Sequence, residues 1–327
     1  MRTSHSRRKL TLLFKGAVTI GLIGILLYIV DWDRAAELVN RGLTKIIIVA
    51  PVLFLVGLAV AAWRWRIILT NVGVSISYRQ TYMGYLFGAF YNVFLPGVIG
   101  GDVVRVTYCK LWAQCPLGTA TATVLLERVF GVLALMLIAC FTYMCFPPTL
   151  SALLTVEGTS FVLLLAGCGM LLIFITLIGR HVWIGWLLKK DKIASNQFIP
   201  SVLRTLNVLD LRTLGTSVVL SALYQTVWIF TTFYISRAIG LFVPIHVFFS
   251  ILPLVYLVTV LPVSLGGLGV REGTFVLLLA QFGVMASDAV TLSFLEYLSR
   301  IVIAGFGGLV YFFSGLPGKK ALLRSAR

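Results

Sequence analysis

Two short stretches of the sequence carry proline, paired glycine and arginine at the same spacing. Residues 95–105 and residues 261–271 both follow the pattern Leu-Pro-x3-Gly-Gly-x3-Arg, in which x is any residue. Proline ends an apolar helix, and paired glycine permits a tight turn that leaves backbone N–H groups uncovered. A helix that begins at this turn directs its positive N-terminus to the same place as the arginine. Together these groups are suited to binding a phosphate.

The two stretches are separated by about half of the chain. Arg105 and Arg271 are 166 residues apart in a chain of 327 residues, so we expect two copies of one unit. Repeated, interrupted helices mark the substrate sites of many transporters. We therefore predict that a lipid phosphate is bound by the motif residues Arg105, Arg271, Gly100, Gly101, Gly266 and Gly267. The alternative is that the glycines only allow close helix packing, while the arginine side chains extend to the lipid head groups.

Charged residues also lie deep within long apolar segments. Glu127 and Arg128 follow about ten apolar or small residues, and Glu296 and Arg300 lie in a similar setting. Exposed to lipid, these four side chains would cost on the order of 10 kcal/mol. Adjacent residues of a helix do not face each other, so Glu127 and Arg128 need separate partners. We predict that both face the protein interior and that at least one pairs with Arg105, Arg271, Glu296 or Arg300.

The remaining charges of this group have individual roles. Glu296 and Arg300 stand four positions apart with the acid first, which favours an ion pair within one helix. Asp102 and Glu272 have no acidic counterpart in the other copy, where positions 268 and 106 hold Leu and Val. We assign gating or charge balance to six residues, namely Asp102, Glu127, Arg128, Glu272, Glu296 and Arg300.

The composition is that of a membrane protein. The chain is 59% hydrophobic and 12% charged, whereas soluble domains hold roughly 25% charged residues. Its net charge of +16 comes from basic residues between apolar segments, which is typical of membrane sidedness and lipid contact rather than of nucleic-acid binding. The three histidines are scattered, the five cysteines show no metal-ligand spacing, and a phosphate-binding G-x4-G-K-[S/T] loop is absent. We therefore expect no metal, no cofactor and no hydrolase or ATPase activity.

The apolar segments predict an all-α integral membrane protein, formed by one membrane domain over residues 1–327. Full spans are expected at 10–30, 44–62, 118–146, 158–179, 214–236 and 289–313. The two motif stretches are expected at the tips of re-entrant hairpins, at 80–104 and 244–285. The halves of the repeat would then cover about 40–150 and 205–315, joined by a basic interfacial linker at 180–212.

Charge predicts the sidedness of these segments. Residues 31–45 carry three acidic and three basic residues, whereas residues 62–117 carry five basic residues and one acidic residue. Because lysine and arginine collect on the cytoplasmic side, residues 62–117, residues 180–212 and both termini are expected in the cytoplasm. The two hairpins would then enter the membrane from opposite faces, as an inverted repeat. The expected location is the cytoplasmic (inner) membrane.

The motif residues resemble a known family. Asn92 through Gly97, Gly100 to Asp102, Arg105, Glu127-Arg128 and residues 261–273 are similar to the flippase-like family, also called the lysylphosphatidylglycerol synthase transmembrane region. The resemblance covers nearly the whole chain, and it adds Asn92 to the expected phosphate-binding residues. In some members this membrane region is joined to a soluble aminoacyl-transfer domain, which this chain is not expected to contain. The resemblance therefore implies lipid handling or translocation rather than aminoacyl transfer.

From the sequence we expect a protein that moves an anionic lipid between leaflets, either a phospholipid or a polyisoprenyl-phosphate-linked lipid. Its partners would be membrane lipids with anionic head groups. Two alternatives remain open: an integral-membrane lipid-modifying enzyme resembling a polyprenyl-phosphate glycosyltransferase, and a membrane partner of a separate lipid-modifying enzyme.

Overall fold

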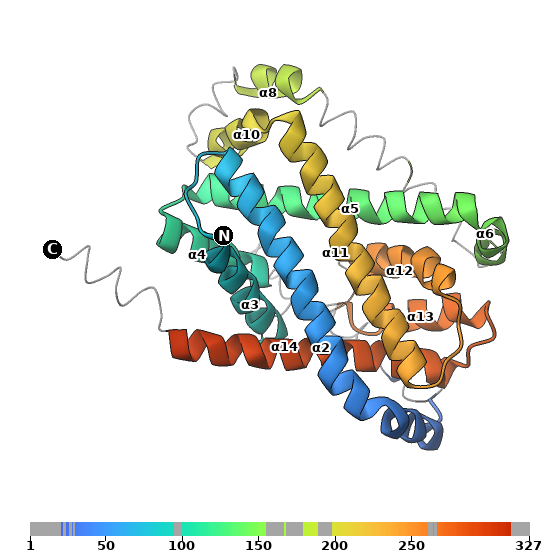
Figure 1. Ribbon diagram of the computed structural model, residues 1–327. Coiled ribbons are helices and arrows are strands. Elements are labelled where there is room, and N and C mark those ends of the chain that lie inside the picture. The colour runs from blue at the N-terminus through green and yellow to red at the C-terminus, as the bar shows by residue number, and fades with distance from the viewer. Residues whose placement is uncertain are drawn as a thin grey trace, which may run out of the picture.

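The computed structural model describes residues 30–94, 100–154, 179–188, 198–260, 264 and 267–314, together with single positions at 21, 24, 25, 28 and 167. Within these ranges every regular element is a helix (Figure 1). The chain is thus an α-helical membrane protein, as its composition predicts. The motif turns at 95–99, 261–263 and 265–266 lie outside the described residues, and so does Gly266.

Four long helices have the length and apolar composition needed to cross a membrane. They are α2 (Trp32–Asn71), α5 (Leu117–Cys145), α11 (Leu211–Ala238) and α14 (Ala286–Ser314). They contain the spans expected at 44–62, 214–236 and 289–313, and α5 covers the span expected at 118–146 except for its last residue. The spans expected at 10–30 and 158–179 fall almost wholly outside the described residues.

Side chains cap the starts of these helices. The Asp31 carboxylate accepts a hydrogen bond from the backbone N–H of Arg34 at 3.1 Å, which begins α2. Asp210 does the same for Thr213 at 2.8 Å and begins α11. Each carboxylate satisfies one of the backbone donors that a helix start leaves unpaired, and it complements the positive end of the helix. These acidic caps fix where two of the long helices start.

Each half also contains a pair of short helices. The first half has α3 (Tyr78–Phe94) and α4 (Gly100–Ala113), and the second has α12 (Ile245–Val260) and α13 (Val270–Ala280). The members of each pair pack against each other. At 14, 16 and 11 residues, α4, α12 and α13 fall short of the roughly 20 residues that a bilayer-spanning helix needs.

Helix bounds recur at the offset of the motif. Adding 166 to the bounds of α3 gives 244–260, against Ile245–Val260 for α12. The same shift takes α5 to 283–311, against Ala286–Ser314 for α14. It takes α2 to 198–237, a range that α10 (Phe198–Val208) and α11 cover together. The correspondence therefore extends far beyond the Pro/Gly motif. The two other described helices, α6 (Pro147–Leu154) and α8 (Arg180–Leu188), belong to the connection between the halves.

The two halves are interlocked. The long helices α2 and α11 pack along each other and run diagonally across α5 and α14 in Figure 1. The short helix α3 packs on α14 of the second half, and its counterpart α12 packs on α5 of the first half. Each half therefore completes the other, and the space between them is enclosed by helices of both.

Candidate functional site

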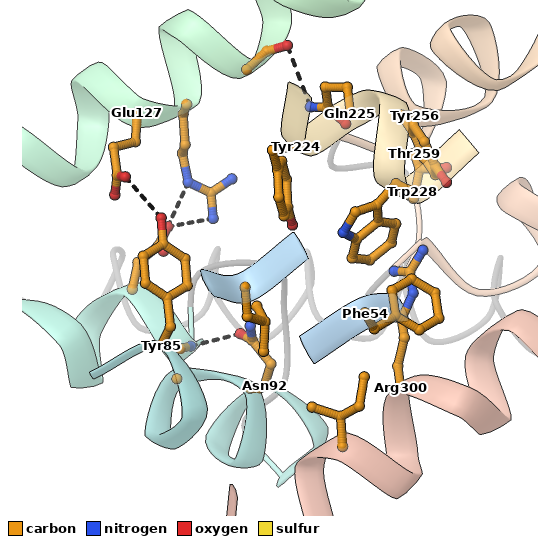
Figure 2. A pocket seen from close by; sticks show the side chains of 18 of the residues that line it. Phe54, Tyr85, Asn92, Glu127, Tyr224, Gln225, Trp228, Tyr256, Thr259 and Arg300 are labelled. Atoms are coloured by element: carbon orange, nitrogen blue, oxygen red, sulfur yellow. Dashed lines mark hydrogen bonds and ion pairs between the residues drawn. The ribbon is translucent and has the colours of Figure 1, made fainter. Parts of the chain in front are cut away.

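A cavity of about 650 Å³ lies between the two halves. All eight long and short helices of the halves contribute to its wall, and Figure 2 shows side chains pointing into it from several of them. Eight residues singled out from the sequence line it, namely Asn92, Gly101, Asp102, Arg105, Glu127, Arg128, Arg271 and Arg300. Residues from both copies of the motif, far apart in the chain, thus share one cavity.

Glu127 is the centre of an ion-pair network in the first half. Its carboxylate is 3% exposed and pairs with the Arg105 guanidinium. It also accepts hydrogen bonds from Arg64 Nε at 3.1 Å and from the Tyr85 hydroxyl at 2.8 Å. The prediction that Glu127 faces the interior is confirmed, and of the four partners that the sequence left open it pairs with Arg105. Because two cations share it, this carboxylate prevents Arg64 and Arg105 from being uncompensated charges inside the membrane.

The Arg105 guanidinium is held between aromatic rings. Its central carbon lies 3.8 Å from the centroid of the Tyr85 ring and 4.3 Å from that of the Trp65 ring. Such cation–π contacts strengthen where water is excluded. The two rings thereby help to hold the guanidinium at the cavity wall.

Asp102 and Arg128 form a second pair of the first half. Arg128 Nε lies 2.5 Å from Asp102 Oδ2, and Arg105 Nη1 contacts the other oxygen of Asp102 at 3.5 Å. Arg128 lines the cavity, as its predicted interior position requires. Asp102 therefore links two arginines of different helices, an arrangement that agrees with an individual role in charge balance.

Arg64 is a site residue that the sequence analysis missed. It was counted among the cytoplasmic loop charges because the span was expected to end at 62, but α2 continues to Asn71. Arg64 is 4% exposed, lines the cavity and donates to the Ser221 hydroxyl at 2.6 Å. Its position three residues after Ala61 and four before Ile68, both fully buried, was the signal that could have identified it. Of the five basic residues counted at 62–117, three are exposed, namely Arg66, Arg79 and Lys110.

The second half holds its motif arginine differently. Arg271 pairs with Glu272, its neighbour in sequence, and Arg271 Nε donates to the Ser293 hydroxyl at 3.0 Å. The other oxygen of Glu272 accepts a hydrogen bond from the backbone N–H of Gly269 at 2.7 Å, at the start of α13. Adjacent helix residues were expected to point apart, but Glu272 turns back to cap the helix and so reaches Arg271. Glu272 thus both caps α13 and balances the arginine.

Glu296 and Arg300 form the expected pair within α14. Arg300 Nη2 lies 2.5 Å from Glu296 Oε1, which also accepts from the Tyr256 hydroxyl at 3.2 Å. The Arg300 guanidinium lies over the Trp228 ring, 4.1 Å from its centroid. Glu296 is fully buried and keeps Arg300 at the cavity wall.

The motif glycines serve packing and backbone conformation. The Gly101 N–H donates to Asn92 Oδ1 at 2.6 Å, and a side chain at Gly101 would clash with the Gly88 carbonyl of α3. Gly267 has φ of +79°, and a side chain there would clash with Thr259 of α12. Gly100 is buried at the first position of α4. These contacts explain why glycine is needed at Gly101 and Gly267, while phosphate binding by the glycines stays a prediction.

The cavity is cationic and rich in aromatic residues. Five arginines line it, namely Arg64, Arg105, Arg128, Arg271 and Arg300. Four carboxylates pair with them, Asp102, Glu127, Glu272 and Glu296, which leaves one net positive charge. The sequence analysis also missed the aromatic wall, to which Tyr85, Tyr224, Trp228, Tyr256 and Tyr297 contribute. Aromatic residues are common in apolar helices, so these five could be recognised as site residues only from their position around one cavity.

Comparison with known proteins gives one family and two archaeal relatives. The family model for the lysylphosphatidylglycerol synthase TM region matches residues 12–307. UPF0104 membrane protein PH1989 of Pyrococcus horikoshii is 25% identical over 118 residues, which are 36% of this chain and 35% of that protein. UPF0104 membrane protein MJ1595 of Methanocaldococcus jannaschii is 27% identical over 109 residues, 33% of this chain and 32% of that protein. The matched part thus spans about a third of each relative's length.

Proposed function

Given that the chain belongs to the lysylphosphatidylglycerol synthase transmembrane-region family, we propose that it moves an anionic lipid between the leaflets of the cytoplasmic membrane. The lipid would be an anionic phospholipid or a polyisoprenyl-phosphate-linked lipid. One observation carries this proposal: a cavity between the two halves is lined by five arginines that both halves contribute. A cationic cavity enclosed by apolar helices suits an anionic head group whose tails stay in the bilayer.

The proposed topology is an inverted repeat. The helix bounds that recur at the 166-residue offset support it, as do the lengths of α4, α12 and α13, too short to span alone. The two pairs of short helices would enter from opposite faces, and both termini would lie in the cytoplasm. In transporters of this type the two repeats move against each other around a central site, which is thereby opened to each side in turn.

The proposed mechanism uses the arginines as phosphate ligands. Without lipid, Arg105 is compensated by Glu127, and Arg271 by Glu272. A phosphate entering the cavity would take over part of these contacts, since guanidinium binds two phosphate oxygens as readily as two carboxylate oxygens. When no lipid is bound, the arginines would be compensated by four carboxylates, namely Asp102, Glu127, Glu272 and Glu296. The protein could therefore change conformation without a bound lipid.

The test is lipid movement in liposomes that contain the purified protein and a labelled anionic lipid. Arg105→Lys and Arg271→Lys keep the charge but lose the planar fork. Loss of one charge-assisted hydrogen bond costs about 1.5–3 kcal/mol, so we expect a roughly ten- to hundredfold loss in binding and slower movement. Arg66→Lys, at an exposed position of α2, is the matched control.

Two outcomes would contradict the proposal. Wild-type rates for both motif variants, in protein shown to be folded, would leave the arginines as structural residues. A chemically altered lipid, detected by mass spectrometry after incubation, would favour a lipid-modifying enzyme instead.

A further inference from the structure

Three polar atoms of residues that line the cavity have no hydrogen-bond partner among the residues that the structure describes. They are Arg105 Nε, Trp228 Nε1 and Arg300 Nε, and all three are buried. Each of them is a donor. A buried donor without an acceptor costs about 1–3 kcal/mol, so these N–H groups favour a ligand that supplies oxygen acceptors.

The carboxylates of the site offer no corresponding place for a cation. Asp102, Glu127 and Glu272 each pair with at least one arginine, and Glu296 pairs with Arg300. Glu296 keeps one unpaired oxygen, but Glu296 is not part of the cavity wall. A cationic head group would therefore meet arginines without a free carboxylate to compensate its charge.

The unpaired donors belong to two separate places. Arg105 lies in the Glu127 network, whereas Trp228 and Arg300 come from α11 and α14. In Figure 2, Tyr85 and Glu127 lie on one side of the cavity, Trp228 and Arg300 lie on the other, and Tyr224 stands between them. The cavity volume of about 650 Å³ lies in the range of roughly 300–1,000 Å³ that is typical of sites for drug-sized ligands, well beyond the needs of one phosphate.

Trp228 is held so that its N–H has a fixed direction. Its ring meets Phe54 edge to face with centroids 4.7 Å apart, and Tyr256 in the same manner at 5.9 Å. The Arg300 guanidinium covers it at 4.1 Å and brings a positive charge to the same place. An indole N–H and the guanidinium stacked on the same ring are donors suited to an oxyanion.

We infer that Trp228 and Arg300 form a second oxyanion site, so that the transported lipid carries a second phosphate on its head group, separated from the one at Arg105. This inference rests on the proposed function and specifies its substrate class. It also separates this chain from the product in its family's name, because a lysyl group would bring ammonium charge into a cavity in which no carboxylate of the described residues is free.

The experiment measures binding, apart from transport. The full chain in detergent is titrated with four lipids that share dioleoyl chains: phosphatidic acid, phosphatidylinositol, phosphatidylinositol 4-phosphate and lysyl-phosphatidylglycerol. We expect phosphatidylinositol 4-phosphate to bind most tightly and lysyl-phosphatidylglycerol most weakly. Trp228→Phe keeps the ring and removes only the N–H, so it should weaken phosphatidylinositol 4-phosphate about tenfold and leave phosphatidic acid unchanged. Trp63→Phe, on the exposed side of α2, is the matched control.

Other results would overturn the inference. Equal affinity for phosphatidylinositol and its 4-phosphate, or equal weakening of all four lipids by Trp228→Phe, would show that no second phosphate is bound there. Tight binding of lysyl-phosphatidylglycerol would refute the charge argument. A further titration uses glycerophosphoinositol 4-phosphate, which has the same head group but no acyl chains. If it binds as tightly as phosphatidylinositol 4-phosphate, the site is one for a soluble phosphate rather than for a lipid. If the binding pattern holds but liposomes show no lipid movement, the proposed function fails and the second site stands.

Discussion

Glu127 and Ser293 occupy equivalent positions in the two halves, 166 residues apart, and each contacts the motif arginine of its own half. In the first half this position supplies the compensating carboxylate. In the second half it supplies a hydroxyl, and the carboxylate comes from Glu272 on the short helix. The two arginines therefore share a geometry but differ in the origin of the opposite charge.

This difference predicts unequal effects at the two positions. Glu127→Gln leaves Arg64 and Arg105 buried without their carboxylate, and breaking a buried ion pair in this way costs about 3–5 kcal/mol. Ser293→Ala leaves the Arg271–Glu272 pair intact and should cost only about 1 kcal/mol. Thermal unfolding of both purified variants in the same detergent checks this. Equal effects would mean that Glu127 does not hold the two arginines.

Close contact of α3 with α14 predicts a contrast between two glycines of α14. A side chain at Gly307 would clash with the backbone carbonyl of Leu86. A Cβ atom at Gly305 would have no neighbouring atom within 4 Å. Gly307→Ala should therefore destabilise the protein by about 1–3 kcal/mol, as overpacking does. Gly305→Ala should be neutral or slightly stabilising, because alanine favours the helix. A stable, fully folded Gly307→Ala variant would contradict the packing of α3 on α14.

The inverted topology predicts the sidedness of two equivalent loops. Ser75 follows α2 and Phe242 follows α11, and both side chains are exposed. In a variant without native cysteines, Ser75→Cys should react with an impermeant reagent only from the cytoplasm, and Phe242→Cys only from outside. Labelling of both from the same side would exclude the inverted repeat and leave the cationic cavity to be explained by another topology.

The cap of α11 predicts a pH dependence of stability. Hydrogen bonds from Thr213 lower the pKa of Asp210 below its ordinary value. A carboxylate whose pKa is lowered in the folded state stabilises it above the unfolded pKa, and this contribution is lost as the pH falls through the folded pKa. Asp210→Ala should thus lower the unfolding temperature at neutral pH but not at acidic pH. Asp210→Asn, which caps without titrating, should show a weaker pH dependence than the wild type.

Much of the fold and part of the site could be predicted from the sequence. The cost of charges in lipid was enough to place Glu127 in the interior and to include Arg105 among its candidate partners. The choice between Arg105 and Arg271, and the second partner Arg64, came only from the structure. Likewise, the four-residue spacing of Glu296 and Arg300 favoured a pair within one helix, which α14 contains. These successes share a cause, since a buried charge in a membrane has few permissible surroundings.

The rest depends on geometry that single segments do not carry. Arg64 was assigned to a loop because apolarity ends near residue 62, although α2 continues beyond it. Trp228 stands in an apolar helix, where tryptophan is unremarkable until Arg300 of α14 is seen to lie over its ring. Contacts between the two halves join residues that are distant in sequence, so neither the aromatic wall nor the second donor pair could be found from periodicity.

The packing of α3 on α14 has a consequence for how the protein is made. The Leu86 carbonyl of α3 packs against Gly307 of α14. This surface of α3 therefore lacks its packing partner until α14, the last described helix, has left the ribosome. Synthesis delivers the N-terminal half first. During that interval its buried arginines already have Glu127, which lies in the same half, whereas the hydrogen bond from Arg64 to Ser221 forms only after α11 has been made. The early half therefore carries its own counter-charge into the bilayer, while the later half, with Glu272 and Glu296, brings its own when it arrives.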